Sequence, residues 1–338
     1  MAVTVGVYLL ELGGQDDDFA VFEARSAASD VTRLAPGLAT ARGVTDRLRQ
    51  LAFTGRADEL LGRTDADVAS ARALLEATTV QRTGTVAVRA EDVRGTTGID
   101  TQRVERELGQ VLVDRGFAVD LEDPDHTLRV LFSEESSGEG VCAVGWLAVE
   151  ADRDFGADPT DRPFFQPGSM DSHLARALVN VAGARPDATV LDPMCGTGGI
   201  LVEAGLIGAD VLGVDVQAKM VAGSRENLAA ALGGPDTDAP AVNWGVARGD
   251  ARRLPVADGA VDAVVFDAPY GRQSKIEGNL GDLMSEALRE ARRVAPRCVV
   301  VGDRPWARTA SGAGWTTEAA FQRPVHRSLT RYVLALRR

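Results

Sequence analysis

Cysteine, lysine and long apolar runs are all scarce in this sequence of 338 residues. Its three cysteines, Cys142, Cys195 and Cys298, are odd in number and far apart, and its three histidines do not cluster with them. This spacing argues against a disulfide framework and a zinc site, so we predict no metal. No run approaches the roughly 20 apolar residues that cross a bilayer, and the first residues lack the basic region of a signal peptide. We therefore expect a cytoplasmic protein with no membrane partner.

The charge is strongly unbalanced, because 49 acidic and 37 basic residues give a formal net charge of −12. Only Lys219 and Lys275 among the bases are lysine. An acid-rich, arginine-rich composition is what we expect of a salt-loving organism, although a GC-rich genome also favours arginine over lysine. Residues 289–338 hold eleven arginines and three acids, so they carry +8 and the rest of the chain −20. This asymmetry indicates either an edge that faces a polyanion or an ordinary solvated surface.

Two regions separated by a linker are predicted. The first, residues 1–150, mixes strand-like alternation with helical spacing, which is typical of an α+β region. The expected elements are strands at 3–12 and 18–24, helices at 44–53 and 66–78, and, from 84 to 150, a strand, a helix capped at Asp100 or Thr101, and three strands. Residues 151–163 are charged, contain proline and glycine, and lack periodicity, so we interpret them as a linker.

Residues 164–338 alternate between apolar runs and helical segments. The runs are TVLDPMCG, VLGVDVQ, VNWGVARGD, VDAVVFDAP and CVVVGD, with helices expected near 218–231 and 280–294. Nearly continuous apolar strands are typical of a parallel sheet that helices cover on both faces, so we predict an α/β domain. The last two runs, WTTEAAFQRPV and SLTRYVLAL, predict a hairpin at the sheet edge.

A glycine turn joins the first of these strands to a helix in VLDPMCGTGGILVEAG. Gly196 and Gly198 allow close approach of a ligand to the backbone and to the helix N-terminus, and Asp215 ends the next strand where a ribose-binding acid is expected. Leu201 stands where a dinucleotide fingerprint needs glycine, which disfavours a nicotinamide dehydrogenase. Asp192 places a negative charge before the turn, which suits a cationic ligand better than a pyrophosphate. These features indicate S-adenosylmethionine.

Two further acids are expected at the same edge. Asp250 follows the third strand, although an ordinary loop acid is an alternative interpretation. Asp267 ends the fourth strand and opens a tetrapeptide that Ala268, Pro269 and Tyr270 complete. These residue types suit methyl transfer to the exocyclic amine of a base, because a carboxylate and a carbonyl can accept its hydrogens while a ring stacks on the base. A simple turn is the alternative.

Several segments resemble a known family. The stretches RPFFQPGSMDSHLARALVNVAG, DPMCGTGGILVEAGL, DAPYGRQS and HRSLTR are similar to motifs of the archaeal tRNA (guanosine-10, N2)-methyltransferases. FAVDLEDPDHTLRVLFSE and the following VGW resemble the core of a THUMP domain, which we place at about residues 60–150. The sequence departs from the family pattern at Ala268, where a proline is usual.

The resemblance implies a Rossmann-like, S-adenosylmethionine-dependent methyltransferase domain at 164–338, behind an N-terminal α+β region that contains a THUMP-like RNA-binding domain. It implies tRNA as the partner, guanine N2 as the methylated atom, one or two methyl groups added, and a guanine site at residues 267–270. The implied cofactor-binding residues are Asp192, Gly196, Gly198, Asp215, Asp250 and Phe165.

Other functions are compatible with parts of the pattern. The tetrapeptide does not separate adenine from guanine, so an amino-methyltransferase that acts on ribosomal RNA or DNA is the nearest alternative. An RNA-binding or folding factor that keeps the cofactor domain without catalysis is an alternative of another class, and Ala268 is the feature that favours it.

Overall fold

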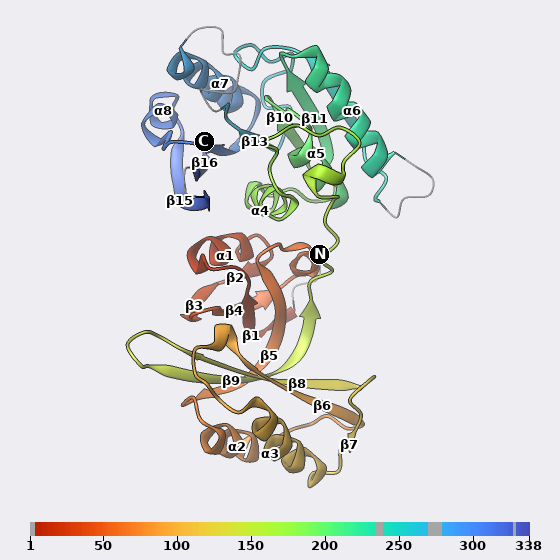
Figure 1. Ribbon diagram of the computed structural model, residues 1–338, viewed down its shortest axis with the longest axis vertical. Helices are drawn as coiled ribbons and strands as arrows, with labels where there is room; N and C mark the ends of the chain where they lie inside the picture. The colour runs from red at the N-terminus through yellow and green to blue at the C-terminus, as the bar shows by residue number, and fades with distance from the viewer. Residues whose placement is uncertain (1–3, 234–238, 270–278, 327–328) are drawn as a thin grey trace. The chain divides into compact units, whose positions relative to one another are not determined.

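The computed structural model describes residues 4–233, 239–269, 279–326 and 329–338 (Figure 1). The chain divides into two compact units, Met1–Arg153 and Asp154–Arg338. Because each unit has its own sheet and its own buried core, the two are described separately below.

One sheet organises the first unit, with strands in the order β2-β4-β1-β5-β9-β8-β6-β7 and with β3 paired to β4. The pairs are antiparallel, except that β6 runs parallel to β7 and to β8. The strands are β1 (Thr4–Leu12), β2 (Ala28–Ser29), β3 (Thr32–Ala35), β4 (Leu38–Val44), β5 (Thr54–Thr64), β6 (Thr85–Asp92), β7 (Ala118–Val119), β8 (His126–Glu134) and β9 (Gly140–Glu150). Short 3-10 turns lie at Asp46–Gln50 and Val93–Gly95.

Helices α2 (Val68–Ala77) and α3 (Thr101–Val113) pack on this sheet around a core that includes Leu108 and Trp146. The predicted cap of α3 is confirmed, because the Asp100 carboxylate accepts a hydrogen bond from the Arg103 amide at 3.0 Å. Four of the apolar residues of α3 are buried, as the amphipathic spacing of its sequence requires.

The prediction of a strand at residues 18–24 is wrong, because this segment lies in helix α1 (Asp17–Ala24). Phe19, Val21 and Glu23 give the segment an alternating pattern, but Ala20 and Ala24 are buried too, so the helix is covered on most sides and lacks a polar face. The Glu23 carboxylate is also buried, where it accepts hydrogen bonds from the amides of residues 52 and 53 at 2.8 and 2.7 Å.

A buried carboxylate lies near the middle of the first sheet. Asp58 of β5 is fully buried, and Nη1 of Arg129 lies 3.8 Å from its Oδ2. Burial raises the pKa of Asp58 to about 7, although the charge of Arg129 opposes the shift. Arg129 is itself buried and pairs more closely with Glu11 and Glu91, at 2.6 and 3.0 Å.

The second unit contains a sheet with the strand order β12-β11-β10-β13-β14-β16-β15. The first five of these strands are parallel, and β16 and β15 form an antiparallel hairpin at the edge, as the sequence predicts. The strands are β10 (Thr189–Asp192), β11 (Asp210–Asp215), β12 (Trp244–Arg248), β13 (Ala263–Asp267), β14 (Arg297–Gly302), β15 (Thr316–His326) and β16 (Leu329–Arg337). The helices are α4 (Ser172–Ala182), α5 (Gly199–Leu206), α6 (Ala218–Leu232), α7 (Leu280–Val294) and α8 (Ala307–Gly312), with a 3-10 turn at Pro159–Asp161.

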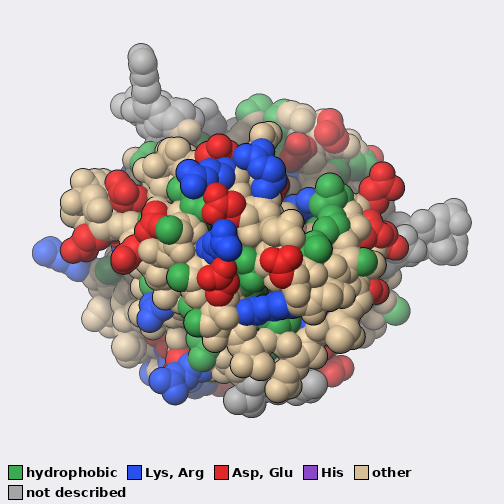
Figure 2. Space-filling view, turned by 90° about the horizontal axis from the view of Figure 1, so that it is seen from below, with side chains coloured by type: hydrophobic (Ala, Val, Ile, Leu, Met, Phe, Trp, Pro, Cys, Tyr) green, Lys and Arg blue, Asp and Glu red, His purple; other side chains and the backbone are tan. Residues whose placement is uncertain are grey.

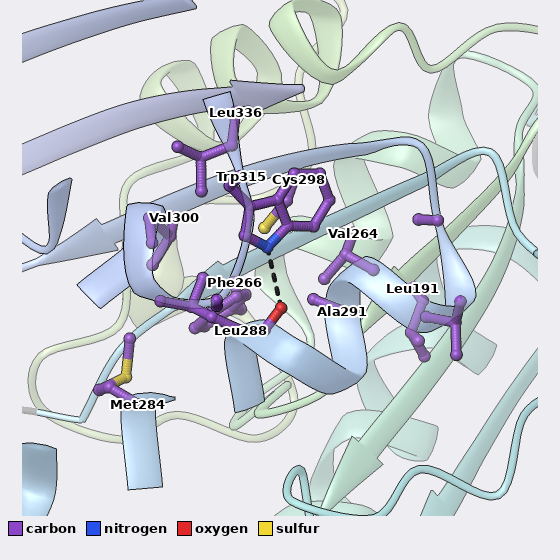
Figure 3. Close-up of a cluster of buried hydrophobic side chains, with 14 of the residues drawn as sticks. Leu191, Val264, Phe266, Met284, Leu288, Ala291, Cys298, Val300, Trp315 and Leu336 are labelled. Atoms are coloured by element: carbon purple, nitrogen blue, oxygen red, sulfur yellow. Dashed lines mark hydrogen bonds between the residues drawn. The ribbon is translucent and has the colours of Figure 1, made fainter. Parts of the chain in front are cut away.

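Both faces of this parallel sheet are buried at its central strand β13, as the apolar sequence of that strand predicts. Residues 263–266 of β13 are all at most 1% exposed, so successive side chains are covered on opposite faces. On one face, Val264 and Phe266 pack with Leu288 of α7 (Figure 3). Trp315 closes this core and donates a hydrogen bond from Nε1 to the Leu288 carbonyl at 2.8 Å.

Several charged side chains on the surface form ion pairs with a side chain of opposite charge. On α2, Arg72 pairs with Glu76, and on α3, Arg103 pairs with Glu107, both at i,i+4 spacing. Figure 2 shows basic and acidic side chains intermixed on the face in view, rather than gathered into patches of one sign. Within the described ranges, no helix is long and apolar enough to cross a membrane.

Candidate functional site

The glycine turn of the second unit connects the end of β10 to the start of α5. Gly196 and Gly198 have φ values of +52° and +79°, in the region that side chains disfavour. A side chain on Gly198 would also overlap Ser224 of α6. The turn therefore requires glycine both for its backbone conformation and for its close packing on α6.

Three carboxylates meet at the carboxyl end of the parallel strands. Asp192, Asp215 and Asp267 end β10, β11 and β13; the first two residues are buried, at 2% and 8% exposed, and the side chain of Asp267 is 20% exposed. Burial raises the pKa of Asp192 well above its usual value, and the negative charges of Asp215 and Asp267 raise it further. The sequence-predicted acids of three separate strands therefore lie within electrostatic reach of one another.

Backbone amides fix the two innermost carboxylates. Asp192 accepts a hydrogen bond from the Met194 amide at 2.9 Å. Asp215 accepts from the amides of Gly196 and Gln217, at 3.0 and 2.8 Å, so it ties the glycine turn to the end of β11. Burial raises the pKa of Asp215, while these two hydrogen bonds lower it.

Asp250 lies after β12, at the same end of the sheet, but its carboxylate forms a two-pronged ion pair with Arg252. The distances are 3.0 Å from Nε to Oδ1 and 2.6 Å from Nη2 to Oδ2. These bonds lower the pKa of Asp250. A ligand that used this carboxylate would therefore share it with, or displace, the guanidinium.

The described part of the predicted tetrapeptide continues strand β13. The Ala268 amide donates a hydrogen bond to the Val301 carbonyl of β14 at 2.8 Å, and Ala268 is buried in the same core as Phe266 and Leu288. A proline at this position has no amide hydrogen and could not form that bond. Pro269 follows and is partly buried, whereas Tyr270 lies outside the described residues.

Phe165 lies in a turn that is joined to the glycine loop. Phe165 is 40% exposed, and the Gln166 side chain donates a hydrogen bond to its carbonyl at 2.8 Å. At the end of the turn, the Ser169 hydroxyl lies 3.2 Å from the hydroxyl of Thr197 in the glycine loop. The structure thus brings Phe165 and the glycine loop into one assembly.

Asn227 of α6 joins this turn to the glycine loop through three hydrogen bonds, and the sequence did not indicate it. Its Oδ1 accepts a hydrogen bond from the Phe164 amide at 2.9 Å, and its Nδ2 donates to the carbonyls of Phe164 and Thr197, both at 2.8 Å. Asn227 is buried, so these bonds are shielded from water. Nearby, the Phe164 ring occupies the space that a side chain on Gly223 would need.

Two buried cations, Arg162 and Arg331, also approach the site. The Arg162 guanidinium lies against Gly199, at the start of α5, and burial lowers its pKa. Arg331 of β16 has Nη2 4.0 Å from an Asp267 oxygen and Nη1 3.7 Å from an Asp171 oxygen. HRSLTR, which contains Arg331, stood out in the sequence, but nothing there indicated these carboxylates as neighbours.

Thiol chemistry is disfavoured at this site. Cys142, Cys195 and Cys298 are free and buried, and burial raises the pKa of Cys142 to about 12 and that of the other two thiols well above the usual value. Cys195 lies in the glycine turn and packs towards Gly213 of β11. Among the described residues, no group of His, Cys, Asp or Glu is arranged to hold a metal ion.

A doubly wound parallel sheet with a terminal antiparallel hairpin, a glycine turn after its central strand and acids at the adjoining strand ends define a Rossmann-like methyltransferase domain. Residues 159–332, more than half of the chain, match the family model described as UPF0020, RMKL-like, methyltransferase domain. The chain belongs to this family.

Named relatives agree with this assignment. The chain is 40% identical over 182 residues to the tRNA (guanine(10)-N2)-dimethyltransferase of Methanothermobacter thermautotrophicus, covering 53% of this chain and 50% of that protein. It is 29% identical over 260 residues to the protein of the same name from Pyrococcus abyssi, covering 74% and 73%. The first alignment thus spans about half the length of that relative. The crystal structure of TrmN from Thermus thermophilus is 23% identical, with 98% and 99% coverage and a TM-score of 0.47.

Proposed function

We propose that the chain methylates the exocyclic N2 amine of guanosine 10 in tRNA, with S-adenosylmethionine as the methyl donor and with one or two methyl groups added. The observation that carries the proposal is the position of Asp267, whose charge reaches Asp192 beside the glycine turn. A base held against Asp267 would therefore lie next to a donor held by that turn. The names of the relatives support the choice of guanine N2 and tRNA.

The residues around the glycine turn fit this donor. S-adenosylmethionine supplies, when bound, an electrophilic methyl group on a positively charged sulfur, beside a positively charged amino group. Burial and neighbouring negative charge raise the pKa of Asp192, and a cationic ligand would relieve this repulsion and favour the ionised carboxylates, so the edge suits a positively charged group. Asp215 is placed at the strand end where a ribose is bound in related folds. The residues that we propose to hold the donor are Asp192, Gly196, Gly198, Asp215, Asp250 and Phe165.

On the substrate side, the chain must make a weak nucleophile reactive. The lone pair of the guanine amine is delocalised into the ring. A carboxylate that accepts one N–H, and a backbone carbonyl that accepts the other, would localise this lone pair and orient it. We propose that Asp267 accepts the hydrogen bond and takes the proton that the methyl group replaces. Ala268 and Pro269 would supply the backbone of the guanine site, and stacking by Tyr270 stays a prediction.

We propose that the first unit contains a THUMP-like domain, at about residues 60–150, that holds the tRNA. The pairing of Arg72 with Glu76 and of Arg103 with Glu107 leaves little unbalanced positive charge on α2 and α3. If the protein also works in a salt-rich cytoplasm, recognition must depend mainly on shape, stacking and arginine pairs. We therefore expect a shallow log–log dependence of tRNA affinity on KCl concentration, measured by filter binding, and a steep slope would contradict this expectation.

The activity is tested directly with unmodified tRNA transcripts and labelled S-adenosylmethionine. We expect label in N2-methylated guanosine after nuclease digestion, and none in a transcript whose guanosine 10 is replaced by adenosine. Asp267→Asn should abolish incorporation while it retains binding of S-adenosylhomocysteine. Asp258→Asn, which changes an exposed aspartate of the same unit, is the matched control and should remain active. Failure of the parent to label any RNA, or full activity of Asp267→Asn, would refute the proposal.

A further inference from the structure

Arg331 is a buried cation that reaches the proposed catalytic carboxylate from a different strand. Its side chain is only 5% exposed, and its Nη2 lies 4.0 Å from Oδ2 of Asp267. Register explains how the two meet: Asp267 pairs with Val301 of β14, and Val301 pairs with Val333, two residues beyond Arg331 on β16. Arg331 therefore reaches Asp267 past the end of the intervening strand.

The other guanidinium nitrogen contacts the start of α4. Nη1 of Arg331 lies 3.7 Å from Oδ2 of Asp171, whose Oδ1 caps α4 by accepting from the Leu174 amide at 2.8 Å. Asp171 follows the turn that contains Phe165. That turn contacts the glycine loop through the hydroxyl of Ser169. One arginine thus connects the proposed substrate carboxylate to the segment that we propose to hold the donor.

The surrounding charges explain why a cation is needed here. Two charged groups of the described residues that act on this site are Asp192 from β10, whose charge interacts with that of Asp267, and Arg331 from β16, which also contacts Asp171 at the start of α4. The neighbouring residues of β14, Val301 and Gly302, are uncharged. Partial burial and nearby negative charge both favour the protonated form of a carboxylate, and an adjacent guanidinium opposes them.

We propose that Arg331 is a positioning residue that keeps Asp267 ionised and holds its carboxylate in one orientation for the substrate amine. The inference rests on the proposed function, because it assigns a role within that reaction. A protonated Asp267 would be a weaker acceptor for the hydrogen bond of the amine and could not take its proton. Arg331 therefore sets the lowest pH at which the site works.

Three variants separate charge, orientation and a general structural effect. Arg331→Gln removes the charge, Arg331→Lys keeps the charge but loses the planar fork, and Arg337→Gln makes the same change at an exposed position of the same strand. The readouts are kcat/KM for tRNA methylation between pH 5 and 9, and the affinity for S-adenosylhomocysteine by calorimetry.

For Arg331→Gln, we expect the acidic limb of kcat/KM to move up by about one to two pH units, with little change in S-adenosylhomocysteine affinity. Arg331→Lys should keep the acidic limb of the parent but lower kcat by about tenfold, because the carboxylate is less well oriented. Arg337→Gln should match the parent in both respects.

The results also separate this inference from the proposed function. A parent enzyme that methylates no RNA refutes the function itself. An active parent with an unshifted acidic limb in Arg331→Gln refutes the role of the charge. If Arg331→Gln does not fold, Arg331→Lys still decides, because a folded lysine variant with the kcat of the parent refutes the positioning role.

Discussion

Replacement of Asn227 tests whether its three hydrogen bonds hold the proposed donor site together. The side chain joins α6 to the backbone of Phe164 on one side and of Thr197 on the other. Asn227→Ala would leave one amide and two carbonyls without these partners in a buried position. Each such loss costs about 1 kcal/mol, and more where water cannot enter. We therefore expect the free energy of unfolding of the second unit to fall by about 2–4 kcal/mol.

The measurement is a urea titration followed by tryptophan fluorescence in a Trp146→Phe background, because the other three tryptophans, Trp244, Trp306 and Trp315, all lie in the second unit. Asn243→Ala is the matched control, since its side chain is exposed and bonds Asp210 at 3.1 Å. The control should lose less than about 1 kcal/mol.

Asn227→Asp distinguishes the donor bonds from the acceptor bond. A carboxylate can still accept from the Phe164 amide, but it cannot donate to the two carbonyls and would face their negative ends. Its pKa in the folded state should therefore be raised, so the loss of stability should shrink as the pH falls and the group becomes a donor. Equal unfolding free energies for Asn227→Ala and Asn243→Ala would refute the reasoning.

The remaining predictions concern three other positions. Asp58 has a folded-state pKa of about 7 against an ordinary value of 3.8, so its contribution to stability falls as pH rises through that window, by up to about 4 kcal/mol. Asp58→Asn should remove this dependence of stability on pH. Denaturant titrations at pH 4 and pH 8 measure it, and a variant whose unfolding free energy changes between the two pH values as much as that of the parent would contradict the prediction. Gly223→Ala should destabilise by about 1–3 kcal/mol because an aromatic ring occupies the space, whereas Gly109→Ala, which meets only a methyl group at 4.0 Å, should stabilise slightly in the same thermal unfolding assay. Ala268→Pro should cost about 1–3 kcal/mol in urea unfolding by removing the hydrogen bond to Val301, and a variant as stable as the parent would show that this bond is dispensable.

Much of the fold could be predicted where periodicity is strong. Helix α7 is strongly amphipathic, and its predicted range, 280–294, matches Leu280–Val294. The parallel sheet followed from strands that are apolar on both faces. The segment 18–24 was misassigned because α1 buries most of its sides, so burial there does not repeat every 3.6 residues.

Site residues could be predicted only where they belong to a recognisable sequence motif. Asp192, Asp215 and Asp267 each end an apolar strand, and strand ends of a parallel sheet share an edge, so the sequence placed them together. Asn227 could not be found in this way, because its partners are backbone atoms more than 29 residues away, which have no sequence signal. Arg331 meets Asp267 only through the register of the final hairpin.

The burial of all three native thiols has a practical consequence for experiments in solution. Neutral, inaccessible sulfur atoms react slowly with maleimides near neutral pH, so they form a silent background for chemical labelling. One cysteine introduced at an exposed apolar position of the first unit, such as Val119 or Leu121, should therefore take up a fluorophore selectively. Whether RNA binds to that unit could then be tested optically without first replacing any native residue.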